Sequence, residues 1–234
     1  MPRMKQVAVP VLAAGLLSGF LFSLILPVRS GWENGWLENS QVLISLLAAF
    51  WCCGLYRRTS HLAAADRSGE PEAWRSLWLV AGLVWLLLAA RELSWGAVFY
   101  PPRTTDELLG PLFPSSQHLP WKPLVDPALA ILLAGALVVF FRHRLGQRLA
   151  QQWRRGNFPL VELLLGCLAL VLASLAEGHL HWLPGWLNAG QQQLLEEWAE
   201  LWGYLVLVAA QWRLSCGFAG QGASAWCVLP ARSL

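Results

Sequence analysis

The chain of 234 residues is rich in apolar and poor in charged residues: 56% are hydrophobic, 13% are charged, and the formal net charge is +3 at pH 7. The apolar residues fall in long blocks, which is typical of integral membrane proteins and unlike the spread pattern of soluble amphipathic helices. The basic residues are scattered and form no patch with aromatic residues, so we expect membrane lipids as partners and no nucleic acid.

Six apolar segments approach or reach the roughly 20 residues that a helix needs to cross a bilayer. In chain order they are 7–26, 41–56, 76–100, 127–141, 159–175 and 194–212. No small-residue cleavage site follows Pro27, so we interpret the first segment as a retained helix and not as a signal peptide. The sequence therefore predicts an all-α fold, a polytopic transmembrane bundle of six helices that forms a single integral membrane domain over residues 1–234.

The distribution of charge predicts the orientation, because Lys and Arg favour the cytoplasmic side. With both termini cytoplasmic, 13 of the 17 Lys and Arg residues lie inside, whereas 10 of the 14 Asp and Glu residues lie outside. We therefore expect a protein of the inner membrane with its functional face toward the periplasm. The excess of outer acidic residues is the feature that requires a reason.

Polar residues precede the second apolar segment in the stretch GWENGWLENSQ, residues 31–41. Asn39 or Ser40 is a suitable helix N-cap, and Glu38 suits the positive end of a helix dipole. These roles do not explain why so many polar groups begin a short helix, so Glu38 and Asn39 are also candidate substrate-binding residues.

Two adjacent ionisable residues, Arg91 and Glu92, lie within the third apolar segment. Glu92 lies roughly 24 Å along a helix that starts at Ser76, inside a slab about 30 Å thick. Ionisable residues inside membranes usually face the bundle interior and find partners there. We expect Arg91 to reach Glu38 or Glu200. Arg91 and Glu92 are the candidate catalytic residues, with Glu92 as general base, and Trp95 is a candidate substrate contact.

The segment from Pro101 to Pro127 contains seven prolines, which forbid a long regular helix. We predict an outer, periplasmic loop over residues 101–127 that forms a lid over the outer ends of the helices.

The stretch LAEGHLHW, residues 175–182, ends the fifth apolar segment with Glu177, His179, His181 and Trp182. On a helix, Glu177 and His181 share one face, whereas in an extended chain Glu177 and both His residues project from one side. Imidazole and carboxylate groups together suit zinc, iron or manganese. Interfacial His residues without a metal role are the alternative, and Trp182 is a candidate substrate contact.

Three acidic residues, Glu196, Glu197 and Glu200, open the sixth apolar segment. Each alone is favourable near a helix N-terminus, but together they repel one another unless a cation or proton intervenes. The candidate ligands of a divalent transition metal are Glu177, His179, His181, Glu197 and Glu200. The cysteines have neither C-x-x-C nor zinc-like spacing, so we expect no disulfide.

Short motifs mark the outer ends of three predicted helices: E-N-G-W-L-E-N at 33–39, R-E-L-S-W-G at 91–96 and E-E-W-A-E-L at 196–201. The first two resemble the E-[DN]-G-x-x-E-N and [RE]-E-[IL]-S-W-G motifs of a loose group of uncharacterised bacterial multi-pass membrane proteins, which also have a late acidic helix start. This chain differs in having Arg91 where the group usually has Glu, and Ala97 and Val98 in place of Gln-Arg. The resemblance implies a bacterial inner-membrane protein and no particular activity.

Three hypotheses for function remain open. The first is a metal-dependent hydrolase in which the outer Glu and His residues converge and act on a lipid or a lipid-linked substrate. The second is a non-catalytic membrane protein, either a small transporter or an assembly subunit, in which the same acids form an ion pathway or a docking surface. The third is a purely structural charge cluster.

Overall fold

A computed structural model describes residues 2–65, 70–177 and 187–219, with side chains for 10–61, 72–177 and 187–216. The α-helices of this part are α1 (Pro2–Ile25), α2 (Trp36–Ala65), α3 (Glu70–Glu92), α4 (Lys122–Arg142), α5 (Leu145–Arg154), α6 (Leu160–Ala176) and α7 (Ala189–Ala219). Short 3-10 helices occur at η1 (Val28–Gly31), η2 (Ser94–Phe99) and η3 (Ser116–His118), and a small antiparallel hairpin consists of β1 (Thr104–Asp106) and β2 (Gly110–Leu112).

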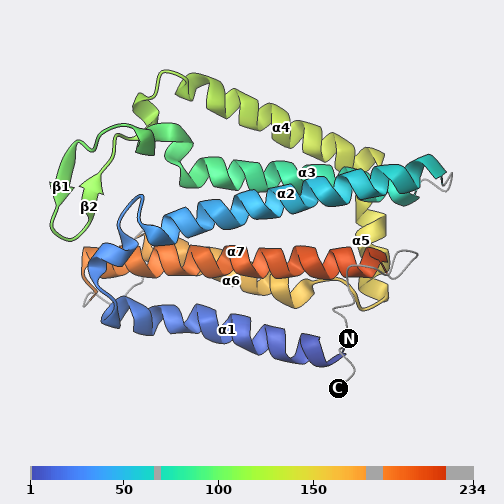
Figure 1. The fold of residues 1–234 in the computed structure, drawn as a ribbon, viewed down its shortest axis with the longest axis horizontal. Helices are drawn as coiled ribbons and strands as arrows, with labels where there is room; N and C mark the ends of the chain where they lie inside the picture. Colours follow the sequence, from blue (N-terminus) through green and yellow to red (C-terminus); the bar gives the residue numbers. More distant parts are fainter. Residues whose placement is uncertain (1, 66–69, 178–186, 220–234) are drawn as a thin grey trace.

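The helices α1, α2, α3, α4, α6 and α7 run along the long axis of the molecule, whereas α5 lies across one end (Figure 1). The long helix α7 contacts α1, α2 and α6, and α2 packs along α3. The start of α1 and the end of α7 lie at the end that holds α5, and the β1–β2 hairpin lies at the opposite end (Figure 1). The described residues thus form the all-helical bundle that the sequence predicts.

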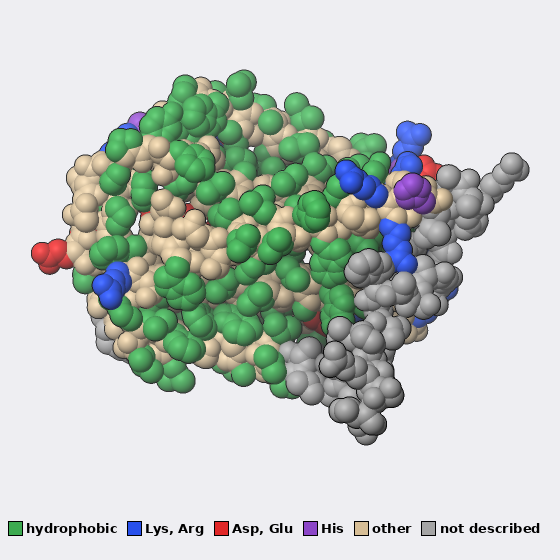
Figure 2. Space-filling model, in the orientation of Figure 1, with side chains coloured by type: hydrophobic (Ala, Val, Ile, Leu, Met, Phe, Trp, Pro, Cys, Tyr) green, Lys and Arg blue, Asp and Glu red, His purple; other side chains and the backbone are tan. Residues whose placement is uncertain are grey.

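Three helical segments are long and apolar enough to cross a membrane: Val28–His61, Glu72–Glu92 and Lys122–Arg142. The apolar helices Pro10–Ile25 and Leu160–Ala176 are shorter. Large apolar side chains on α2 and α4 point outward, with Phe50 79% and Ile131 71% exposed, and apolar side chains cover much of the face in Figure 2. Outward-facing apolar surface of this extent is what a lipid environment accommodates.

Small residues allow α1 and α7 to pack closely, as is usual between helices in membranes. A Cβ atom on Gly15 would lie 2.2 Å from the Trp202 ring, and Trp198 donates its Nε1–H to the Gly15 carbonyl at 2.9 Å. Ala169 and Ala173 of α6 and Ala199 of α7 form the neighbouring contact, and all three are buried.

A buried glutamine, Gln211, links α7 to α2 and α3. Its Oε1 accepts from the Trp85 Nε1–H at 2.6 Å and from the Cys52 thiol at 3.3 Å. Its Nε2 donates to the Ala48 carbonyl at 3.3 Å. Both ends of the amide are therefore paired, so this polar group stabilises the packing without an unsatisfied atom in an apolar region.

An ion pair joins α7 to α6 near the end that holds α5. Arg213 Nη1 lies 2.9 and 2.8 Å from the two carboxylate oxygens of Glu162, which is 7% exposed. Arg213 Nη2 also donates to the Gly156 carbonyl at 3.2 Å. These contacts satisfy a buried carboxylate and fix the position of α7 along α6.

The sequence predicts that the third apolar segment is helical as far as Tyr100. In the structure, α3 ends at Glu92. The chain then turns through η2, where Trp95 and Gly96 have positive φ angles of 57° and 98°. Positive φ interrupts a right-handed helix. The fourth helix is longer than predicted: α4 begins at Lys122 and not at Pro127. Pro123 is tolerated there because it lies in the first turn, where its missing N–H costs no hydrogen bond.

The expectation of no disulfide is wrong, because Cys216 is disulfide-bonded. A disulfide requires two Cα atoms within about 7 Å. The spacing of cysteines in the sequence does not reveal that proximity.

The hairpin contacts the segment between α1 and α2. Trp32 donates its Nε1–H to the Leu108 carbonyl at 3.0 Å, and Glu33 Oε2 accepts from the Phe113 N–H at 3.3 Å. The turn is held by Asp106, whose Oδ1 accepts from the N–H groups of Leu109 and Leu108, and these bonds lower the pKa of Asp106. The role of residues 101–127 as a lid stays a prediction.

Candidate functional site

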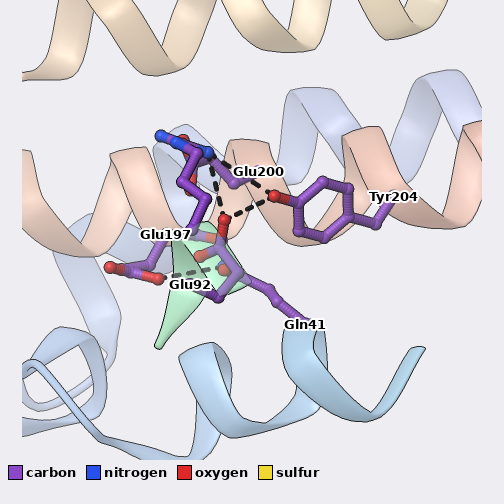
Figure 3. A network of polar contacts seen from close by, with 6 residues as sticks. Gln41, Glu92, Glu197, Glu200 and Tyr204 are labelled. Carbon is purple, nitrogen blue, oxygen red and sulfur yellow. Dashed lines mark hydrogen bonds and ion pairs between the residues drawn. The ribbon is translucent and has the colours of Figure 1, made fainter. Parts of the chain in front are cut away.

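The candidate site lies where the end of α3 meets the first half of α7, on the hairpin side of the bundle. Arg91 Nη2 lies 2.6 Å from Glu200 Oε1, and Arg91 Nη1 lies 3.0 Å from Glu92 Oε1 (Figure 3). Glu92 and Glu200 are 6% and 7% exposed, whereas the Arg91 side chain is 49% exposed. One guanidinium at the edge of the site therefore bridges two buried carboxylates from different helices.

Tyr204 completes this network from the next turn of α7. Its hydroxyl donates to Glu92 Oε1, and Arg91 Nη1 lies 3.5 Å from the same hydroxyl (Figure 3). Tyr204 follows Glu200 by four residues, so the two side chains share one face of α7. The ring packs edge-on against Trp85, with 6.2 Å between centroids. Glu92 is thus held by a charged donor and a phenol.

A fully buried amide, Gln41 of α2, extends the site to a second face of α7. Gln41 Nε2 donates to the Glu197 carbonyl and to Glu197 Oε2, both at 2.9 Å (Figure 3). Gln41 Oε1 is buried and has no hydrogen-bond partner within the described part of the chain. An acceptor oxygen without a donor beside a carboxylate is suited to a cation or to an added proton donor.

Glu38 and Asn39 are occupied with the start of α2. Glu38 accepts from the N–H of Asn34, just before α2, while Asn39 Nδ2 donates to the Gly35 carbonyl at 2.7 Å. Because α2 begins at Trp36, Asn39 lies inside the helix and is not its N-cap, contrary to the sequence interpretation. Their geometry supports a structural role for both residues.

Five carboxylates gather at this end of α2, α3 and α7, and we call them the carboxylate cluster: Glu38, Glu92, Glu196, Glu197 and Glu200. Repulsion from Glu200 acts on each of the other four. Arg91 is the cation that forms ion pairs with members of the cluster among the described residues. Buried carboxylates without compensation are costly, so the arrangement favours uptake of at least one further cation.

Of the remaining candidate residues, Trp95 lies in η2, and Glu177 lies near enough to Glu196 for the two carboxylates to repel each other. The carbonyl of Trp95 accepts from the Trp121 Nε1–H at 3.0 Å, and the Lys122 ammonium lies 6.0 Å from the centre of the Trp95 ring. Glu177 is the exposed C-cap of α6. The other predicted residues, His179, His181 and Trp182, lie outside the described residues.

Within the described ranges, no three His, Cys, Asp or Glu side chains are grouped so that they could hold a metal ion. Two of the predicted ligands, His179 and His181, are not among those residues.

No protein-family model matches the chain, and no curated protein and no solved structure matches it.

Proposed function

We propose that the chain is a multi-pass protein of a bacterial inner membrane that binds a cation at an outward-facing carboxylate cluster, as the ion-coupling site of a small transporter does. The observation that carries this proposal is the imbalance of charge: among the described residues, the five carboxylates of the cluster form ion pairs with one guanidinium, that of Arg91. In an apolar environment such an imbalance is relieved by a proton or a metal cation.

Buried polar groups that continue along α7 support a transporter over a site confined to one face. The face of α7 that carries Glu200 and Tyr204 continues to Gln211. At 1.5 Å per residue, Gln211 lies roughly 16 Å from Glu200 along the helix. On α2, Ser45 lies one turn beyond Gln41, is fully buried, and has an Oγ without a hydrogen-bond partner in the described part of the chain. Intramembrane polar groups of this kind are typical of ion and proton pathways.

The proposed topology has six crossings, by α1, α2, α3, α4, α6 and α7, with both termini in the cytoplasm. It is supported by the basic residues near α5, which include Arg142, Arg144 and Arg154. A periplasmic reporter enzyme fused after Leu234 should be inactive. An active reporter would contradict this topology and reverse the face of the carboxylate cluster.

Calorimetry of the purified protein in mild detergent tests cation binding, with sodium, magnesium, manganese and zinc chlorides titrated separately and proton release recorded. We expect saturable binding of at least one cation with release of protons, because both compete for the same carboxylates. Glu197→Gln should weaken binding while leaving the Arg91 ion pairs intact. Glu72→Gln, at an exposed position near the opposite end of α3, is the matched control. Absence of both binding and proton release in the wild type would overturn the proposal.

A metal-dependent hydrolase acting on a lipid or a lipid-linked substrate is the second candidate. It is favoured by Glu92, a buried carboxylate whose orientation is fixed by Arg91 and Tyr204, as a positioned general base requires. In this function His179 and His181 would supply the nitrogen ligands of the metal, beside the carboxylates. Elemental analysis should then find a stoichiometric transition metal that is lost in the double variant His179→Ala and His181→Ala. Retention of the metal in that variant, or its absence from the wild type, would remove this candidate.

A further inference from the structure

A cavity lies at the opposite end of the molecule from the carboxylate cluster, where α4 turns into α5 beside the start of α3. Its volume is about 330 Å³, near the lower limit for a small-molecule site. The polar side chains that line it are Arg142, His143, Arg144, Gln147, Arg148 and Gln151. The lining residues include no Asp or Glu, and the cavity wall carries the guanidinium groups of Arg142 and Arg144.

The backbone conformation of Arg144 indicates that its side chain has a role beyond the turn between α4 and α5. Arg144 has the left-handed conformation, with φ 51° and ψ 39°, directly between α4 and α5. Gly or Asn would adopt this backbone more easily. An arginine at the strained position places a permanent positive charge on the cavity wall, which a turn alone does not need.

The cavity opens at the end of a helix suited to lipid. No residue of α4 is buried, and its final turns expose Leu137, Val138 and Phe141. Directly beyond these apolar residues come Arg142 and Arg144. Most of the blue side chains visible in Figure 2 lie at this right-hand end, where Figure 1 places α5. An apolar stripe that ends in a basic cavity is complementary to an acyl chain joined to a phosphate.

We propose that this cavity binds the phosphate group of an anionic phospholipid, with the acyl chains lying along the exposed apolar face of α4. The guanidinium groups of Arg142 and Arg144 would donate to the phosphate oxygens, for which their planar geometry is well suited. Gln147 and Gln151, one turn apart on α5, would donate to the headgroup. This proposal does not depend on the function of the carboxylate cluster.

Native mass spectrometry of delipidated protein, titrated with phosphatidylglycerol or with phosphatidylcholine, tests this site. The wild type should bind phosphatidylglycerol in preference to phosphatidylcholine. The double variant Arg142→Gln and Arg144→Asn should bind phosphatidylglycerol roughly 30-fold more weakly, since each basic residue near an anionic lipid contributes about fivefold. Asn is chosen at 144 because it tolerates the left-handed conformation.

The matched control is the double variant Arg57→Gln and Arg154→Gln, which removes two exposed charges near the same end but outside the cavity. It should retain wild-type preference. If both double variants lose the same affinity for phosphatidylglycerol, Arg142 and Arg144 act only through general charge attraction, and the proposal is overturned. Displacement of phosphatidylglycerol by inorganic phosphate at equal concentration would overturn the lipid assignment, because the acyl chains would then contribute nothing. If the double variant does not fold, Arg142→Gln alone provides the same comparison outside the strained corner.

Discussion

Arg91 of α3 and Glu200 of α7 meet at 2.6 Å, and this ion pair joins two helices whose residues are 109 positions apart in the chain. Glu200 is buried, so its charge depends on that partner. The same guanidinium also forms an ion pair with Glu92, so Arg91 compensates the charge of both buried carboxylates.

Replacement of Arg91 by Leu should lower the stability of the protein in detergent. Loss of the guanidinium leaves Glu92 and Glu200 without their ion pair, but Arg91 is half exposed, so we expect about 2 kcal/mol and not the full cost of breaking a buried pair. Thermal unfolding followed by tryptophan fluorescence measures the effect. Arg103→Leu, at an exposed loop position, is the control, and an equally small shift for both variants would contradict this role.

Replacement of Gln211 by Leu should also destabilise the bundle, by about 1 kcal/mol, because the Trp85 Nε1–H loses its acceptor in an apolar region. A double-mutant cycle with Trp85→Phe isolates the interaction. The combined variant should lose less stability than the sum of the single variants. Strict additivity would mean that the 2.6 Å contact contributes nothing.

Replacement of Gly15 by Ala should weaken the packing of α1 on α7. The added methyl group would overlap the Trp202 ring, at 2.2 Å, and relieving that overlap should cost about 1–3 kcal/mol. Gly54→Ala is the matched control, because no atom lies within 4 Å of the position that its Cβ would take. Limited proteolysis and thermal unfolding distinguish the two variants. Equal stability of Gly15→Ala and Gly54→Ala would show that α1 does not pack on α7 in this way.

The hairpin turn should loosen in acid. Hydrogen bonds from the N–H groups of Leu109 and Leu108 lower the pKa of Asp106, so the stability that its carboxylate contributes is present above the unfolded-state pKa of about 3.9. That contribution is lost as the pH falls through the lower folded-state pKa. Hydrogen exchange of the two amides should accelerate, relative to neighbouring amides, in Asp106→Asn at neutral pH and in the wild type in strong acid. Unchanged hydrogen exchange of the Leu108 and Leu109 amides in Asp106→Asn would contradict the role of the Asp106 carboxylate in this turn.

The sequence identifies the apolar helices, because long hydrophobic runs are a strong signal, and segments in α2, α3 and α4 are long and apolar enough to cross a membrane. It does not give their ends. Thus α2 continues past Tyr56 to Ala65, since a helix does not stop where apolar residues stop. The amphipathic helix α5 is missed altogether, because its polar residues resemble those of a loop when only long apolar runs are sought.

The candidate site is predicted in part. Ionisable residues inside an apolar segment draw attention to Arg91, Glu92 and Glu200, and the contact between Arg91 and Glu200 is one of the two that the sequence suggests. Gln41 and Tyr204 are missed, because an amide and a phenol in apolar runs look like ordinary packing residues. The spacing of four between Glu200 and Tyr204 was a usable signal. Which carboxylate meets which partner depends on helix rotation, which one sequence does not specify.

The two ion pairs of α7 together fix its position along its own axis relative to α3 and α6. Arg91 holds Glu200, and Glu162 holds Arg213, at points about 20 Å apart along the same rod. A slide of α7 by a single residue, about 1.5 Å, would strain both pairs at once. Displacement of α7 along its axis would therefore disturb its contacts with α3 and α6 together.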